Sequence, residues 1–176
     1  MGLKTMTKGE IRSKVGGRGF MVKQTDVGTL VCHGGIDEVD IALKHGIQAP
    51  QGINLIFCER GIEIKAIASG KVVLSAIPSS DIVSIKFAGG MQPSGNMAGV
   101  ATSTLVGGVL LGPIGALAGA TAGLNAASSG RICYAVEYKA QPENGTLLVS
   151  FVPGFKKKVD KLFSRAYPSL FDPTMR

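Results

Sequence analysis

The stretch INLIFCERGIEIKAIASGKVVLSAIP, residues 53–78, carries the pattern that decides the fold of this chain. An apolar run, INLIFC, precedes the turn residues ERG, and the next run alternates Ile62 and Ile64 with Glu63 and Lys65. Apolar and polar residues that alternate on both sides of a short turn predict a β-hairpin. The turn SGK then leads into VVLSAI, a third strand that ends at Pro78, because proline has no amide proton for the sheet.

Further strand patterns lie on both sides of this stretch. VGTLVCHGG, residues 27–35, fits a short strand, whereas IDEVDIALKHG, residues 36–46, has a mixed period that fits either a short helix or an irregular lead-in. DIVSIKF, residues 81–87, alternates as a half-buried strand does. RICYAVEYKA, the turn QPENG and TLLVSFV, residues 131–152, predict a second hairpin.

The last regular pattern is helical. PGFKKKVDKLFSRAY, residues 153–167, spaces Phe155, Val159, Leu162, Phe163 and Ala166 as one apolar stripe, with the cations on the far side. Pro168 and Pro173 prevent the helix from continuing into the tail. The expected fold class is therefore mainly β with α: an antiparallel β-barrel or sandwich capped by a C-terminal amphipathic helix.

Three segments resemble the pleckstrin-homology-like (PH-like) domains of the bacterial GRAM type. KHGIQAPQGINLIFCERGIEIKA is similar to the opening of these domains, IPSSDIVSIKF to their Ile-Pro-x-x-x-Ile strand, and GPIGALAGA to an Ala/Gly-rich insertion found before the penultimate strand in some of them. The resemblance covers about residues 43–167. It implies a non-enzymatic domain that binds lipids, peptides or proteins and forms homo-oligomers.

The expected organisation has four parts. Residues 1–30 form a flexible basic arm, residues 31–167 form the PH-like domain, residues 92–130 interrupt that domain as an inserted apolar helical hairpin, and residues 168–176 form a tail.

The insertion holds an uncharged run, GVATSTLVGGVLLGPIGALAGATAGLNAASSG, residues 99–130. Gly108 and Gly112 are four residues apart, and so are Gly115, Gly119 and Gly123 in turn. On a helix this spacing aligns glycines into flat strips that allow close helix packing. The residues expected to mediate oligomer or membrane contact are Gly108, Gly112, Pro113, Gly115, Gly119 and Gly123, with the proline separating two helical arms. Three interpretations stay open: packing on the protein's own domain or on neighbouring subunits, shallow or oligomer-assisted membrane insertion, and a flexible loop.

The flanking strands restrict the membrane interpretation. If residues 81–87 and 131–138 belong to one small sheet, both ends of the insertion lie on the same side of a bilayer, and a single crossing is excluded. Each arm has roughly 12 to 16 residues, against about 20 for a membrane-spanning helix. The arms are therefore expected to be too short to span a bilayer singly.

The formal net charge of +7 is concentrated at the two ends of the sequence. Basic ends attract anionic membranes or nucleic acid, or simply stay solvated. The residues expected to contact an anionic surface are Lys156, Lys157, Lys158, Lys161 and Arg165. Nucleic acid is the less favoured ligand, because Phe155 and Phe163 are expected on the buried stripe rather than among the cations as stacking platforms.

No motif for catalysis or metal binding is evident. Cys32 with His33, and His45 with Cys58, lack the spacing of zinc ligands, so we expect no metal, no cofactor and no catalytic residues. The three cysteines have no paired spacing, and no secretory signal is visible, which favours the cytoplasm, including the inner membrane face as a peripheral location.

The function expected from the sequence is a non-enzymatic PH-like binding module that self-assembles, associates with membranes, or does both. Its expected partners are further copies of the chain, an anionic membrane surface or a protein. One alternative is a membrane-disrupting, pore-forming effector assembled through the inserted hairpin. The other is a nucleic-acid-binding or phage-type structural protein that uses the basic N-terminal arm.

Overall fold

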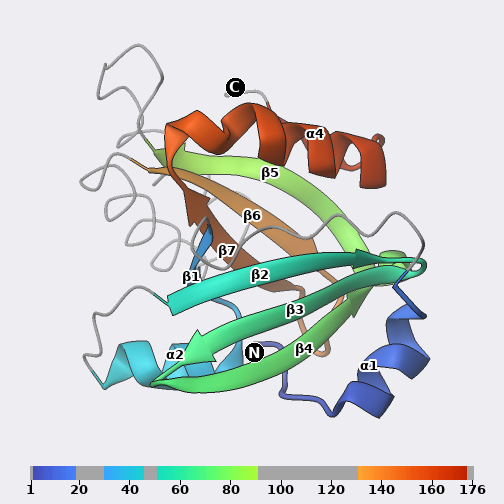
Figure 1. Cartoon of the computed structure of the whole chain (residues 1–176), viewed down its shortest axis with the longest axis vertical. Coiled ribbons are helices and arrows are strands. Elements are labelled where there is room, and N and C mark those ends of the chain that lie inside the picture. Colours follow the sequence, from blue (N-terminus) through green and yellow to red (C-terminus); the bar gives the residue numbers. More distant parts are fainter. Residues whose placement is uncertain (1, 19–29, 46–50, 91–130, 174–176) are drawn as a thin grey trace.

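A computed structural model of the chain describes residues 2–18, 30–45, 51–90 and 131–173 (Figure 1). These residues form an eight-stranded sheet with the strand order β4-β3-β2-β1-β7-β6-β5-β8, together with helices and 3₁₀ turns. The strands are β1 (Leu30–Gly34), β2 (Gln51–Cys58), β3 (Gly61–Ala68), β4 (Lys71–Pro78), β5 (Ile82–Gly90), β6 (Ile132–Tyr138), β7 (Gly145–Phe151) and β8 (Phe171–Asp172). The helical elements are α1 (Lys8–Val15), α2 (Asp37–Lys44), η1 (Ser79–Asp81), η2 (Pro153–Phe155) and α4 (Lys156–Ala166). The expected class, mainly β with α, is confirmed.

The stretch that decides the fold forms the antiparallel ladder β2-β3-β4. Ile53 pairs with Ala66, and Ala66 pairs with Val73, so three apolar residues cross the sheet in one row. The turn between β3 and β4 has positive φ at both Ser69 (50°) and Gly70 (76°), the backbone of a tight hairpin turn. The expected hairpin and third strand are therefore present.

Strand β5 departs from simple alternation. The sequence pattern predicts Ile82 and Ile85 on opposite faces, but both side chains are buried in the core. The reason is a register irregularity between Ile82 and Ser84 in the pairing with β6. An extra residue at a bulge changes the face on which the following side chains lie.

Strands β5 and β6 hold the two ends of the glycine-rich insertion next to each other. They pair antiparallel, with Gly90 opposite Ile132, so the flanking strands belong to one sheet, as expected. The hairpin expected over residues 92–130, with Gly108, Gly112, Pro113, Gly115, Gly119 and Gly123, lies outside the described residues.

The expected barrel is not closed. Strand β4 ends the sheet on one side and β8 ends it on the other. The backbone explains why these edges do not pair: the Met6 amide donates to the Leu74 carbonyl on β4 (2.8 Å), whereas β5 carries β8 in parallel and the Ile85 amide donates to the Leu170 carbonyl (2.8 Å). Each side of the sheet thus contacts a segment other than the opposite edge, and the described sheet stays open.

The N-terminal segment contains a helix that the sequence pattern does not predict. Residues 1–30 are expected as a flexible arm, but within them residues 8–15 form α1, which buries Ile11 and Val15 against Ala76 of β4. The helix begins with a capping box, in which Thr7 and Glu10 each accept a hydrogen bond from the other's backbone amide. Because this short helix is mostly basic and has few apolar residues, a hydropathy pattern does not predict it.

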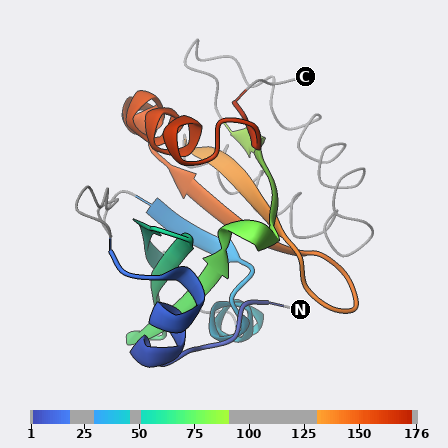
Figure 2. The same ribbon diagram turned by 90° about the vertical axis from the view of Figure 1, so that its right-hand side faces the viewer.

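The region whose type the sequence leaves open is helix α2. Its buried residues, Val39 and Ala42, face the core. The acidic residues of its first turn bind backbone amides, including one near the N-terminus. The Asp37 carboxylate accepts a hydrogen bond from the Gly2 amide (2.9 Å), and Asp40 accepts one from the Gly35 amide (3.0 Å). Figures 1 and 2 place α1 and α2 at one end of the molecule and α4 at the other.

Replacing the core side chain of α1 tests whether this helix belongs to the fold. Ile11→Ala removes a side chain that is 4% exposed, and we expect the free energy of unfolding to fall by about 2–4 kcal/mol. Arg12→Ala, on the exposed face of the same helix, is the control and should change it by less than about 0.5 kcal/mol. Chemical denaturation measures both; equal, small effects would show that the segment does not contribute to the core.

Candidate functional site

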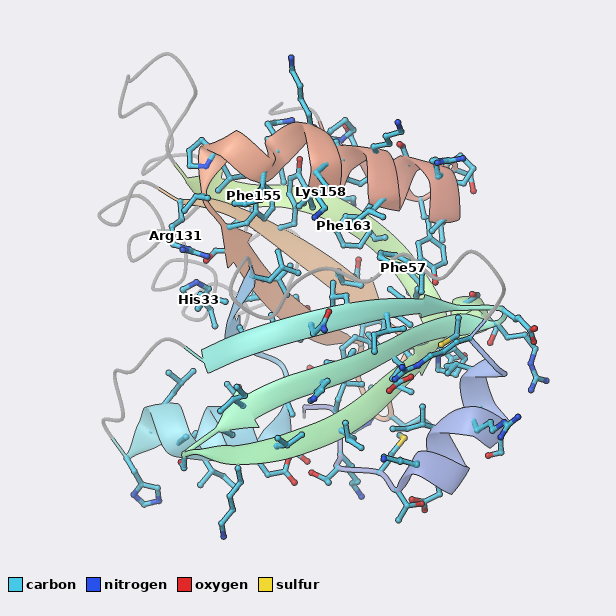
Figure 3. All side chains as sticks on the ribbon, viewed as in Figure 1. His33, Phe57, Arg131, Phe155, Lys158 and Phe163 are labelled. Atoms are coloured by element: carbon cyan, nitrogen blue, oxygen red, sulfur yellow. The ribbon has the colours of Figure 1, made fainter. Side chains whose placement is uncertain are left out.

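The C-terminal helix α4 is held on the sheet by an aromatic cluster. Phe163 makes an edge-to-face contact with Phe57 of β2 (5.7 Å between ring centroids) and another with Tyr134 of β6 (6.2 Å). It also stacks on Phe171 of β8 (5.7 Å). Such ring pairs add to the free energy gained from burial alone. One side chain of α4 therefore ties together strands from distant parts of the sheet, as Figure 3 shows for Phe163 and Phe57.

A polar contact sets the rotation of this helix. The buried hydroxyl of Tyr134 donates to Oδ1 of Asp160 (2.5 Å), and the Lys156 ammonium pairs with Oδ2 of the same carboxylate (2.5 Å). Burial, followed by the bond to Asp160, raises the pKa of the Tyr134 phenol above its ordinary value. Asp160, the acid of α4, is thereby turned toward the sheet.

Lys156 is separated from the other expected surface cations by this contact. Its side chain is 29% exposed, and its ammonium lies against Asp160 rather than facing outward. The sequence places it in the anionic-surface set, since three consecutive lysines look equivalent there. In the structure it belongs to the joint between helix and sheet.

The remaining four cations form an exposed strip, which we call the cationic strip: Lys157, Lys158, Lys161 and Arg165. With 3.6 residues per turn, these four positions fall within about 100° of the helix circumference. The apolar residues Val159, Leu162 and Phe163 are buried on the opposite side. The structure thus brings together four of the five residues expected at an anionic surface.

Phe155 does not lie on the buried apolar stripe of α4, where the sequence pattern places it. Its side chain is 37% exposed, and the Lys158 ammonium lies 5.9 Å from the centroid of its ring. Phe155 is the N-cap residue of α4 and belongs to the turn η2, so the periodicity of the helix does not fix its direction. Figure 3 shows Phe155 and Lys158 side by side at the start of α4.

A second polar cluster was not evident from the sequence. His33 Nε2 lies 2.7 Å from Ser150 Oγ, and Arg131 Nε donates to the same oxygen (2.9 Å). Burial, followed by the charge of Arg131, lowers the pKa of His33 to about 4, so its imidazole is neutral at pH 7. The Ser150 side chain is fully buried, so the cluster is placed to join β1, β7 and the start of β6. No local motif could reveal residues that only strand register brings together.

The described residues provide no metal site. No group of three or more His, Cys, Asp or Glu side chains within them is arranged to hold a metal ion. Burial raises the pKa of the Cys32 and Cys133 thiols to about 12, which disfavours the reactive thiolate at both positions.

Comparison of the chain with protein-family models, with curated proteins and with solved structures gives no match. Within the described ranges, no helix has both the length and the apolar character needed to cross a membrane. The candidate site therefore rests on the geometry of α4 and the turn before it.

Removing the Tyr134 hydroxyl should loosen the helix. Tyr134→Phe deletes a hydrogen bond to a charged acceptor, and we expect the free energy of unfolding to fall by about 1–3 kcal/mol, with faster hydrogen exchange in α4. Tyr167→Phe is the matched control, because the Tyr167 hydroxyl has a longer contact with Ser79 (3.4 Å) and should cost less. A larger loss in the control would contradict the assigned role of Tyr134.

The buried imidazole makes stability depend on pH. The pKa of His33 is about 4 in the folded protein, against an ordinary value of 6.5 for histidine, so the unfolded chain binds the proton more readily. Stability from this group is present above about pH 6.5 and is lost as the pH falls toward 4. The free energy of unfolding should decline over this interval, and His33→Gln should make the decline shallower. His45→Gln, at an exposed position, should leave the slope unchanged; the reverse pattern would exclude His33 as the source.

Proposed function

We propose that the protein is a non-enzymatic PH-like module that binds anionic membrane surfaces through the cationic strip of α4. The observation that carries this proposal is the segregation of charge on the helix. Lys157, Lys161 and Arg165 are exposed along one face, while Asp160 is turned to Tyr134. The exposed face therefore presents cations without the helix's own acid beside them.

The strength of such a strip follows from simple electrostatics. A Lys or Arg close to an anionic leaflet contributes about 1 kcal/mol, and the attraction falls off within about 10 Å at moderate salt. Four cations on one face amount to about 4 kcal/mol, which is weak, reversible binding. A peripheral protein at the inner face of a membrane fits this strength, and several copies on one oligomer would bind more tightly through avidity.

The PH-like assignment is supported by the order of elements. Seven antiparallel strands run in the order β4-β3-β2-β1-β7-β6-β5, and a terminal amphipathic helix follows them. This is the layout that the sequence resemblance implies. The open edges at β4 and β8 are the feature in which this chain departs from a closed barrel.

Self-assembly through the glycine-rich insertion is the second part of the proposal. Its support is the sequence spacing of Gly108, Gly112, Gly115, Gly119 and Gly123, together with the pairing of Gly90 with Ile132. Because β5 and β6 are paired neighbours, the chain leaves the sheet at β5 and returns to it at the adjacent strand β6. A subunit can therefore present residues 92–130 to another copy without separating β5 from β6.

Removing charge from the strip tests the membrane proposal. In the triple variant Lys157→Gln, Lys161→Gln, Arg165→Gln, we expect binding to phosphatidylserine-containing vesicles to weaken about 100-fold at low salt, because about 3 kcal/mol of attraction is lost. Co-sedimentation with these vesicles, and with vesicles of phosphatidylcholine alone, measures the change.

The matched control removes the same charge from another exposed helix. The control variant carries Lys8→Gln, Arg12→Gln and Lys14→Gln on α1. It lowers the net charge by the same amount as the α4 variant and should preserve most of the vesicle binding. Loss of binding in the control but not in the α4 variant would move the surface to the N-terminal helix. If the unmodified protein binds RNA or DNA more tightly than vesicles, nucleic acid rather than a membrane is its ligand. Dye leakage from the vesicles on binding would favour the pore-forming alternative.

A further inference from the structure

The turn before α4 carries an exposed apolar pair beside the cationic strip. Val152 is 39% exposed and Phe155 is 37% exposed, and three lysines, residues 156–158, follow directly in the sequence. We propose that Val152 and Phe155 insert into the interfacial layer of the bilayer while the strip contacts the anionic headgroups. This inference rests on the proposed function and names the residues that enter the lipid.

The backbone holds this pair in a fixed, projecting turn. The Phe155 amide donates to the Val152 carbonyl (3.0 Å), and Pro153 occupies the first position of η2 between them. A Cβ added to Gly154 would meet no atom within 4 Å, so the tip of the turn stands clear of its neighbours. An apolar pair on such a turn can enter an interface without rearrangement of the sheet.

The chemistry of the tip suits a lipid interface. An aromatic ring with a lysine ammonium 5.9 Å from its centroid combines an apolar body with a charge that can reach toward headgroups. Interfacial binding becomes stable when apolar insertion and basic attraction act together, because either signal alone is marginal. The Val152 and Phe155 side chains supply the first signal, and the cationic strip supplies the second.

The same features fit a protein partner less well. Lysines are depleted at the centres of protein interfaces, where charges are costly to desolvate. Here the apolar pair is bordered by the exposed residues Lys157 and Lys158, and a headgroup layer can accommodate their charges. The apolar pair and its neighbouring lysines therefore favour a bilayer over a protein groove as the binding partner of this turn.

Another exposed apolar pair provides a control of similar composition. Ile67 is 37% exposed and Val72 is 58% exposed, and they lie opposite each other on β3 and β4. Lys65 and Lys71 are exposed nearby on the same two strands. This pair also combines exposed apolar side chains with nearby lysines, but it lies on the sheet, away from α4.

Insertion can be observed with one fluorophore, because the chain contains no tryptophan. Phe155→Trp places a reporter in the turn, and Val72→Trp places it in the control pair. On vesicles of phosphatidylcholine and phosphatidylserine, we expect the emission of F155W to shift to shorter wavelength and to be quenched by brominated lipid chains. The emission of V72W should stay as it is in solution.

A second pair of variants measures the contribution to affinity. Val152→Ser with Phe155→Ser should weaken vesicle binding at least about tenfold, and the effect should persist between about 0.1 M and 1 M salt, since apolar transfer is not screened. Ile67→Ser with Val72→Ser should leave binding unchanged.

The outcomes separate the two proposals. If the unmodified protein does not sediment with the vesicles, the proposed function fails. If it sediments while F155W emission is unshifted and the double serine variant binds normally, the insertion of the turn is overturned and the electrostatic surface stands.

Discussion

The joint between α4 and the sheet is the constraint on which the surface of this protein depends. Tyr134 reaches from β6 to Asp160, Lys156 pairs with the same carboxylate, and Phe163 packs among rings from three strands. Because the helix's acid is engaged in this joint, its remaining cations face outward together. A helix free to rotate about its axis would present Asp160 between its lysines, and the surface would lose its single sign of charge.

The two edges of the sheet do not pair with each other to close a barrel. The Met6 amide donates to the Leu74 carbonyl of β4, and β8 pairs in parallel with β5, so each side of the sheet is contacted by another segment. Helix α1 adds Ile11 and Val15 to the outer side of β4. Helix α4 lies at the opposite end of the molecule from α1 (Figure 2).

Alternation and turn residues in the sequence predict most of the strands and the terminal helix, because period-two and helical patterns depend on local burial. They do not predict α1, whose two buried residues leave too weak a stripe, or the bulge at β5, which puts both Ile82 and Ile85 in the core. Four of the five expected surface cations are exposed together. The Lys156 ammonium lies against Asp160 rather than facing outward, because it forms an ion pair with that carboxylate. The Phe155 side chain is exposed rather than buried, because Phe155 belongs to the turn that precedes the helix. The cluster of His33, Arg131 and Ser150 depends on strand register, which sequence spacing does not encode.

We propose that the outward face of α4 and the turn before it form the surface that meets an anionic membrane. The most direct test is to follow the backbone amide signals of the full chain by NMR while nanodiscs containing phosphatidylserine are added. We expect chemical-shift changes and line broadening to concentrate in residues 152–165 and to be small in the β3–β4 turn. Perturbation of α1 or of the β3–β4 turn, with residues 152–165 unchanged, would contradict it.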